Sequence, residues 1–470
     1  MATGFDLCNG LYDCACNPAL ISCRNDSIQV VERQALSIAR RLFTTSAVMF
    51  AVRLFGAGVM FAVQAGIARL MGAESLGQYA LAVSVMNLIA VAIPLGFPAV
   101  ASYFASQYAT HGHGGLLRQF YRQACLQAFA LGILALLIGP VILSNFGGVA
   151  GDLSHHWRPV VLTAIALSML TLTGAVIIAF KRPFIALAGD GISRPLVLAL
   201  SFALAYRFAP GDKVHGLLWF SCIGTGILAL IYVWIGWRFI AAVPAKAIHA
   251  SEQRRWWFYA LPWALLALVG DFFFDFDLLL LSWQMPYTEL AVFSVTTRLF
   301  SLAAFGVTAV YSISLPHLFE AEANRIPGAL LARIQHTNIA ATGTAVAMLV
   351  GALIIAPFAF MLMGPAFVKA TGPLAILCAA LLIRSVFGPG ALVLSLAQKP
   401  YRPLIPMAIG IAVVMIGNYF LVPIYGLYGA TISAAFALSI WAAALWFITL
   451  RLTGSDVSIF PAIFARKFLS

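Results

Sequence analysis

The chain has 470 residues, of which 62% are hydrophobic and only 9% are charged. Soluble globular domains carry roughly 25% charged residues, so this composition excludes an ordinary water-soluble domain. The formal net charge is +12, but no basic cluster is interleaved with the aromatic residues that stack on bases. Nucleic acid is therefore not expected as a partner.

The first 41 residues are expected to form a cytoplasmic leader. They contain no basic stretch followed by an apolar core, so no cleavable signal peptide is predicted. Four cysteines gather here, Cys8, Cys14, Cys16 and Cys23. They lack C-x2-C pairing and a nearby histidine, and we predict neither a metal site nor another cofactor.

Twelve apolar runs follow, each close to the roughly 20 residues that a helix needs to cross a bilayer. They lie at residues 42–64, 77–103, 123–144, 158–180, 190–208 and 215–237, and then at 258–281, 289–315, 337–363, 372–396, 403–422 and 428–450. The runs show none of the two-residue alternation of barrel strands. The sequence therefore predicts an all-α, polytopic membrane protein with about twelve transmembrane helices.

These runs fall into two six-helix lobes, residues 42–237 and 258–450, joined by a cytoplasmic linker at 238–257. A cytoplasmic amphipathic tail, 451–470, ends the chain. Pro94 and Pro98 interrupt the second run, and Pro195 follows two glycines at the start of the fifth. Such breaks suit helices that bend around a cavity.

Lysine and arginine concentrate on one side of the predicted membrane. That side carries most of the loop arginines and lysines, including Arg40, Arg41, Arg118, Arg122, Lys181, Arg182, Arg254, Arg255, Lys399 and Arg402. The opposite loops hold Arg69, Arg158, Arg207, Lys213 and Lys369. Positive loops stay cytoplasmic, so we expect a multi-pass protein of the bacterial inner membrane with both termini in the cytoplasm.

An internal repeat relates the two lobes. A shift of 214 residues aligns ARLMGAESLGQYALAVS, from Ala68, with SWQMPYTELAVFSVTTR, from Ser282. The repeat rests on hydropathy, loop length and a few identities, such as Met71 with Met285 and Leu76 with Leu290. Transporters built from repeats bind substrate near the midplane between them, so we expect the binding site between the lobes.

The same segment from Ala68 resembles the first outer hairpin of the polysaccharide flippases in the multidrug, oligosaccharidyl-lipid and polysaccharide exporter superfamily. Asp277 followed by LLLLSWQMPYTELAVF is similar to a later motif of that family, although Phe293 stands where a tyrosine is usual. LVPIYGLYGATISAA, from Leu421, and FMLMGPAFVKATGPLAIL also resemble family segments. The resemblance runs from about residue 40 to 450.

This resemblance implies a twelve-to-fourteen-helix export fold with two lobes in a V. It also implies a flippase that moves undecaprenyl-pyrophosphate-linked oligosaccharide from the inner to the outer leaflet for surface polysaccharide biosynthesis. Alternating access coupled to an ion gradient would drive the movement. The expected partners are the lipid-linked oligosaccharide, membrane lipids, and a polysaccharide polymerase and glycosyltransferases of the same pathway.

Three arginines, Arg53, Arg298 and Arg384, fall near the middle of predicted helices. A charge at that depth costs at least about 2.5 kcal/mol, so each is expected to face a wet cavity or to pair with an acid. Arginine binds phosphate oxygens bidentately, which makes all three candidate substrate-binding residues. The resemblance places the first, seventh and eighth runs at the cavity. It places the tenth run, 372–396, behind them, so a structural partner is the favoured alternative for Arg384.

The seventh apolar run, residues 258–281, carries three acids, Asp271, Asp275 and Asp277. They are candidates for taking up a proton or Na⁺ during transport, and ion pairs that fix helix packing are the alternative. A third alternative places Asp271 at the helix end, outside the membrane core. In one continuous helix, Asp271 and Asp275 would share a face, whereas Asp277 would point away from both.

No ATP-binding loop, zinc-protease helix or nucleophile elbow occurs, and we expect the chain not to be an enzyme. His111 and His113 lie in a glycine-rich loop and are assigned no metal. A drug or organic-cation antiporter of the same superfamily remains an alternative, as do a flippase for lipid-linked peptidoglycan precursor, a membrane glycosyltransferase or polymerase, and a structural scaffold.

Overall fold

The computed structural model describes residues 51–144, 149–209, 211–244, 252–270, 272–323, 329–396, 401–454 and 456–461. The predicted leader and most of the predicted tail lie outside these residues. Residues 51–55 belong to one compact unit, Met1–Phe55, and all later residues belong to a second, Gly56–Ser470. The contacts given below lie within the second unit.

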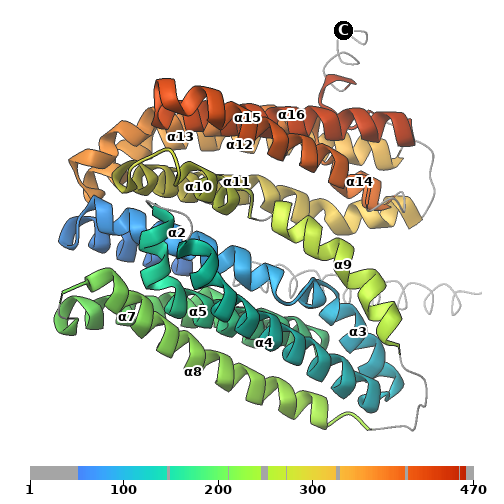
Figure 1. Cartoon of the computed structure of the whole chain (residues 1–470). Helices are drawn as coiled ribbons and strands as arrows, with labels where there is room; N and C mark the ends of the chain where they lie inside the picture. The colour runs from blue at the N-terminus through green and yellow to red at the C-terminus, as the bar shows by residue number, and fades with distance from the viewer. Residues whose placement is uncertain are drawn as a thin grey trace, which may run out of the picture. The chain divides into compact units, whose positions relative to one another are not determined.

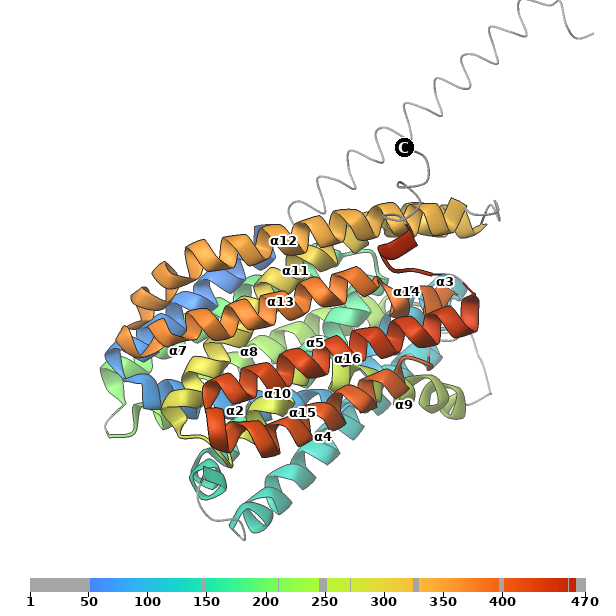
Figure 2. The same ribbon diagram turned by 90° about the horizontal axis from the view of Figure 1, so that it is seen from above.

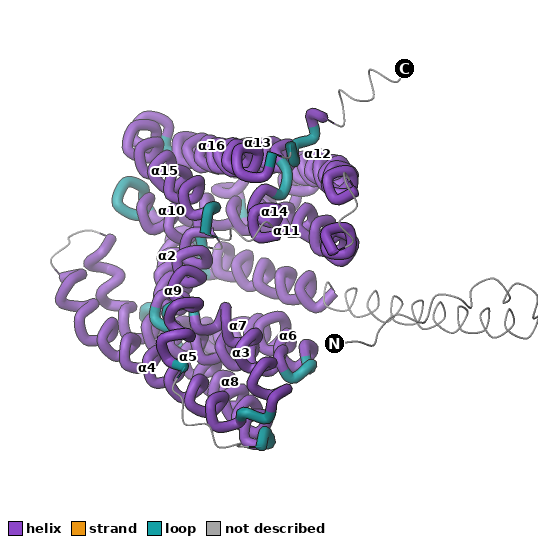
Figure 3. Tube along the Cα trace, turned by 90° about the vertical axis from the view of Figure 1, so that its right-hand side faces the viewer, coloured by secondary structure: helices purple, strands orange, loops and turns teal. Residues whose placement is uncertain are grey.

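Helices make up nearly all of the described chain, and no strand occurs in it (Figure 3). The first half holds the helix Ala51–Leu70, α2 (Ala73–Ala92), α3 (Phe97–His111), α4 (Gly114–Ser144), α5 (Val149–Ala179), α6 (Pro183–Ala188), the π-helix η1 (Gly189–Ser193), α7 (Arg194–Phe208) and α8 (Lys213–Ala241). The second half holds α9 (Gln253–Gly270), α10 (Phe273–Leu281), α11 (Tyr287–Ala323), α12 (Ala329–Met363), the 3-10 helix η2 (Pro365–Ala370), α13 (Thr371–Phe387), α14 (Gly390–Leu396), α15 (Leu404–Tyr425) and α16 (Leu427–Thr453).

Eleven helical segments in the described part are long and apolar enough to cross a membrane. Many of their large apolar side chains point outward, such as Leu230 and Ile424, which are 71% and 72% exposed. Lipid can cover such surfaces, and helices satisfy their own backbone hydrogen bonds there. The all-α, multi-pass membrane fold is thereby confirmed.

The predicted segment 258–281 is not one of the eleven, because the structure divides it into α9 and α10. Asp271 falls at this break and lies outside the described residues. The expectation that Asp271 and Asp275 share one face assumed an unbroken helix, and the interruption removes its basis.

The predicted second segment is also two helices, α2 and α3. Pro94 cannot continue the hydrogen bonding of a helix, and the chain turns through Leu95 and Gly96 with φ angles of 47° and 81°. A Cβ atom on Gly96 would overlap the carbonyl oxygen of Ala260 in α9. Glycine at this turn therefore allows both the left-handed conformation and the close approach of α9.

The predicted fifth segment begins earlier than expected. Its membrane-crossing stretch runs from Pro183 to Phe208 and joins α6, η1 and α7. The glycines that blurred its start form the π-helical turn, and the carbonyl of Gly191 lies against Gly56 of the first helix. Single π turns inside helices are frequent at functional sites.

Two sets of helices lie on opposite sides of α2 in Figure 1. Helices α4, α5, α7 and α8 lie side by side at the bottom of Figure 1, whereas α12, α13, α15 and α16 lie together at its top and run alongside one another in Figure 2. Helix α2 contacts α5 of the first half and also α10 and α11 of the second. The division of the chain into two lobes at residues 238–257 stays a prediction.

Helices α2 and α11 begin at Ala73 and Tyr287, which are 214 residues apart, the offset of the sequence repeat. Gly77 is buried where these helices meet, and a Cβ atom there would overlap the carbonyl of Tyr287. The matched Leu76 and Leu290 are 1% and 0% exposed. The second helices of the two repeated hairpins, α2 and α11, thus pack against each other through their first turns.

Candidate functional site

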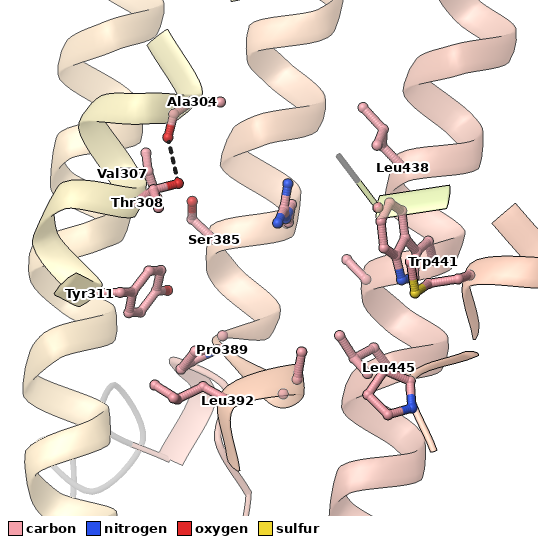
Figure 4. A pocket seen from close by; sticks show the side chains of 18 of the residues that line it. Ala304, Val307, Thr308, Tyr311, Ser385, Pro389, Leu392, Leu438, Trp441 and Leu445 are labelled. Carbon is pink, nitrogen blue, oxygen red and sulfur yellow. Dashed lines mark hydrogen bonds between the residues drawn. The ribbon is translucent and has the colours of Figure 1, made fainter. Parts of the chain in front are cut away.

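A cavity of about 510 Å³ opens between helices of the second half (Figure 4). Its walls come from α9, α11, α13, α14, α15 and α16, and most of its lining side chains are apolar. Arg384 of α13 is the one charged residue among those that line it in the described part of the chain. The cavity therefore combines an apolar wall with a single positive charge.

Arg384 lies beside Trp441 of α16, with the guanidinium carbon 5.9 Å from the centroid of the Trp441 ring. The indole Nε1 of Trp441 is buried and has no hydrogen-bond partner within the described residues. Both side chains carry only hydrogen-bond donors. A ligand in the cavity that offers acceptor oxygens would suit the Arg384 guanidinium.

The opposite wall is built on α11. The Tyr311 hydroxyl donates a 2.8 Å hydrogen bond to Asn338 Oδ1, and Asn338 Nδ2 donates to the carbonyl of Val457 at 3.2 Å. One turn earlier, Thr308 Oγ1 donates to the carbonyl of Ala304 at 3.0 Å (Figure 4). These bonds hold the wall in place.

A second group of charged residues connects α10 with α2 and α7. Asn87 Nδ2 donates to the two carboxylate oxygens of Asp275 at 3.4 and 3.5 Å. Arg194 donates from Nη2 to Asn87 Oδ1 at 3.5 Å and from Nη1 to Asp190 Oδ1 at 3.1 Å. The result is a polar chain that runs from the second half, through α2, to the π-helical turn.

Arg298 of α11 lies near this chain and is half-buried. Its positive charge acts on Asp275 and on the buried Tyr79 of α2, as does the charge of Arg194. Arg298 does not line the cavity of Arg384. Arg298 therefore lies within electrostatic range of Asp275, and its role in substrate binding stays a prediction.

Asp277 points away from Asp275 and is completely buried. Asn418 Nδ2 of α15 donates to its Oδ1 atom at 2.6 Å. The other carboxylate oxygen, Asp277 Oδ2, and the amide oxygen, Asn418 Oδ1, have no hydrogen-bond partner within the described residues. Two buried acceptor oxygens are therefore left for a proton or a cation.

Arg53 and Asp271 are the two remaining candidate residues. Arg53 is exposed on the helix Ala51–Leu70 and belongs to the unit Met1–Phe55, whereas the cavity is built from residues of Gly56–Ser470. Asp271 lies outside the described residues. Arg298 and Arg384 have different surroundings, since Arg298 acts on Asp275 and Arg384 lines the cavity beside Trp441.

Sequence reasoning missed Arg194 and Trp441. Arg194 lies within the apolar stretch Pro183–Phe208 and is a membrane-embedded charge by the argument that selected the other three. The adjacent glycines and Pro195 made it look like part of a loop. For Trp441 the sequence holds no signal, because a tryptophan in an apolar run is an ordinary core residue.

Comparisons with known proteins identify the fold. No protein-family model and no curated protein sequence matches the chain. A solved inward-facing structure of a multidrug resistance MATE family transporter of the MOP superfamily matches with a TM-score of 0.71 and 15% identity, over 86% of this chain and 98% of that one. An outward-facing structure of such a transporter matches at 0.61 and 16% identity, over 86% and 93%.

The inward closed conformation of the lipid II flippase MurJ matches with a TM-score of 0.63 and 12% identity, over 85% of this chain and 87% of that one. The chain therefore has the fold of MOP-superfamily transporters. The matched proteins include drug transporters and a lipid flippase, and none of those named is an enzyme.

Proposed function

We propose that this protein is a flippase that moves a polyprenyl-pyrophosphate-linked oligosaccharide from the cytoplasmic to the periplasmic leaflet for surface polysaccharide biosynthesis. The observation that carries the proposal is the cavity lined by Arg384. Its single charge is positive, and the ring of Trp441 lies beside the guanidinium. A pyrophosphate supplies the negative charge and the acceptor oxygens that suit this guanidinium.

The size and lining of the cavity suit part of such a ligand. Pockets of about 300 to 1,000 Å³ hold drug-sized molecules, and the cavity of about 510 Å³ lies in this range. It can take the pyrophosphate and an adjoining sugar, while the polyprenyl chain stays in the bilayer. Aromatic rings of Trp263, Tyr311 and Trp441 in the wall offer flat apolar faces to a sugar ring.

Asp277 is the residue that we propose for ion coupling. A buried carboxylate that is ionised and only half satisfied is unfavourable by several kcal/mol, so uptake of a proton or Na⁺ stabilises it. Asp277 Oδ2 and Asn418 Oδ1 are oxygen ligands of the kind that hard cations prefer. Asp275 is the second candidate, because its link to Arg194 joins the two halves of the chain.

A drug or organic-cation antiporter is the second candidate function. It is favoured by the MATE transporters among the structural matches and by the aromatic side chains in the cavity wall. It is disfavoured by Arg384, which repels a cationic ligand. A flippase for lipid-linked peptidoglycan precursor shares the pyrophosphate chemistry, so only the sugar specificity separates it from the proposal.

The location of the protein and its partners are also part of what we propose. The chain would lie in the bacterial inner membrane with both termini in the cytoplasm, and a polysaccharide polymerase and glycosyltransferases would act with it. The resemblance to polysaccharide flippases and the distribution of loop lysines and arginines support this arrangement.

Binding by the full chain in lipid nanodiscs tests the proposal, with a polyprenyl-pyrophosphate-linked oligosaccharide as the ligand. Arg384→Ala is expected to weaken binding roughly 10- to 100-fold, the effect of losing a charge-assisted hydrogen bond. Arg384→Lys should retain part of the affinity, because the charge remains but the bidentate geometry is lost. A polyprenyl-pyrophosphate without sugar should respond in the same way.

Arg451→Ala is the matched control. Arg451 also lies on an aromatic ring of α16, 5.2 Å from the centroid of Phe447, but does not line the cavity. If both alanine variants bind the lipid equally well, the cavity does not hold the pyrophosphate. If Arg384→Ala instead gains affinity for an organic cation such as ethidium, the antiporter is the better description.

A further inference from the structure

A group of three histidines and one aspartate lies apart from the cavity, on the predicted periplasmic side. His155 and His156 belong to the first turns of α5, Asp212 precedes α8, and His215 lies in the first turn of α8. One ligand atom from each residue can be chosen so that all four lie within 4.8 Å of one another. Residues almost 60 positions apart in the chain thus meet where α5 packs against α8.

Asp212 uses its two carboxylate oxygens for different purposes. Oδ1 accepts hydrogen bonds from the backbone N–H groups of Val214 and His215 at 2.9 and 3.0 Å, which caps the N-terminus of α8. Oδ2 lies 3.7 Å from His155 Nε2 and 3.9 Å from His156 Nε2. The cap therefore fixes the carboxylate while one oxygen faces the imidazoles.

The three imidazole rings are crowded together. His156 Nδ1 lies 3.1 Å from His215 Nδ1, and the rings of His155 and His215 stack with their centroids 4.4 Å apart. Protonation of all three would place positive charges in contact beside one carboxylate. Neutral imidazoles have no such conflict, and the neutral ring is the form that binds metal.

We propose that His155, His156, Asp212 and His215 form a binding site for one divalent transition-metal ion, with Zn²⁺ as its best match. Imidazole nitrogens combined with a single carboxylate suit Zn²⁺ and related ions, whereas Mg²⁺ and Ca²⁺ prefer oxygen ligands. Tetrahedral zinc places its ligand atoms about 3.4 Å apart, so the set has only to contract. The His155 side chain is exposed, so packing does not prevent it from rotating.

Trp219 gives the site an optical reporter. Its indole N–H donates to His215 Nε2 at 2.9 Å, which requires a lone pair on Nε2. A metal bound to His215 Nδ1 places the ring proton on Nε2, and a metal bound to Nε2 takes the lone pair. In both cases the Trp219 hydrogen bond is broken, so metal binding changes the surroundings of the indole. The metal ion would also fasten α5 to α8 at their periplasmic ends.

Calorimetric titration of the purified full chain with ZnCl₂ or MgCl₂, after removal of metals with EDTA, tests the site. Cys8, Cys14, Cys16 and Cys23 are replaced by serine in every sample to remove competing thiols. We expect one Zn²⁺ per chain, no Mg²⁺ binding, and a Zn²⁺-dependent rise in melting temperature. His156→Gln and His215→Gln should each weaken Zn²⁺ binding at least tenfold.

Asp212→Asn separates metal binding from helix capping, because asparagine is also a good N-cap residue. This variant should keep the melting temperature of the metal-free protein and lose Zn²⁺ affinity, which keeps the test valid if a histidine variant fails to fold. His111→Gln with His113→Gln is the matched control, since these stacked rings lie 5.8 Å apart in another part of the chain.

Tryptophan fluorescence gives an independent readout. Zn²⁺ should change the emission of the parent protein, and Trp219→Phe should bind Zn²⁺ without that change. Absence of Zn²⁺ binding, or equal affinity in the parent, His156→Gln and Asp212→Asn proteins, would overturn the proposal. So would a loss of affinity in the His111 and His113 control as large as in the cluster variants.

Discussion

Asn418 of α15 donates a 2.6 Å hydrogen bond to the fully buried carboxylate of Asp277 in α10. The bond joins two residues 141 positions apart in the sequence and leaves one oxygen of each without a partner in the described chain. The pair thus unites a structural contact with the chemistry expected of a coupling site, and each of these roles can be tested separately.

For the structural role, Asn418→Ala should lower the free energy of unfolding by about 1 to 3 kcal/mol, because it leaves a buried acceptor unpaired. The double variant Asn418→Ala with Asp277→Ala should lose less than the sum of the two single changes. Denaturant unfolding in detergent measures the cycle. Additive losses would show that the two side chains do not interact.

For the coupling role, Asp277→Asn should abolish transport driven by an imposed ion gradient while ligand binding remains, because the amide cannot take up a proton. Liposomes with a pH gradient or a Na⁺ gradient identify the ion. Glu289→Gln is the control, since Glu289 is an acid paired with Lys369 at 3.7 Å, away from this site. Gradient-driven transport that is unchanged in Asp277→Asn would exclude the residue from coupling.

Gly77→Ala should destabilise the contact between α2 and α11, because its Cβ atom would overlap the carbonyl of Tyr287. We expect a loss of about 1 to 3 kcal/mol, as for an overpacked core. Gly174→Ala in α5 is the control, since no atom outside its own helix lies near a Cβ there. That change should be neutral or stabilising, by up to about 1 kcal/mol. Equal effects of the two changes would contradict the close approach.

Tyr108 links α3 to α9 on the predicted cytoplasmic side. Its hydroxyl accepts from Trp256 Nε1 and donates to Glu252, both at 2.7 Å. Burial raises the pKa of Tyr108, so the hydroxyl stays protonated and can donate. Tyr108→Phe leaves the buried indole N–H unpaired and should cost about 1 to 3 kcal/mol. The exposed Tyr103 provides the control, and Tyr103→Phe should change the melting temperature little.

Asp456 makes the stability of the folded protein depend on pH under acidic conditions. Partial burial raises the pKa of its carboxyl, but hydrogen bonds from Ser458 and Trp446 outweigh this effect and hold the pKa below the usual value. The stabilisation is present above the unfolded pKa of about 3.9 and is lost as the pH falls through the lower, folded pKa. Ser458→Ala should reduce this loss, as measured by melting temperature between pH 6 and pH 3. A steeper acid dependence in Ser458→Ala would reverse the assigned sign.

The sequence by itself determined that the chain is all-helical and crosses a membrane many times. A bilayer demands about 20 apolar residues per crossing, and this demand acts on each segment separately. The breaks near Pro94 and at the glycines before Pro195 were visible for the same reason, because proline and glycine act on the local backbone. The acids of the run at residues 258–281 could also be selected as candidate site residues from the sequence, since a charge inside the membrane is rare.

Only the tertiary structure decided which of these side chains meet. Arg384, expected behind the lining helices, faces the cavity with Trp441, whereas Arg298 accompanies Asp275. The histidines at 155 and 156 carry no metal-binding pattern on their own and gain one only because α8 brings Asp212 and His215 beside them. Helical period fixes the relative directions of side chains within one helix, but the neighbour that each one meets depends on how separate helices pack.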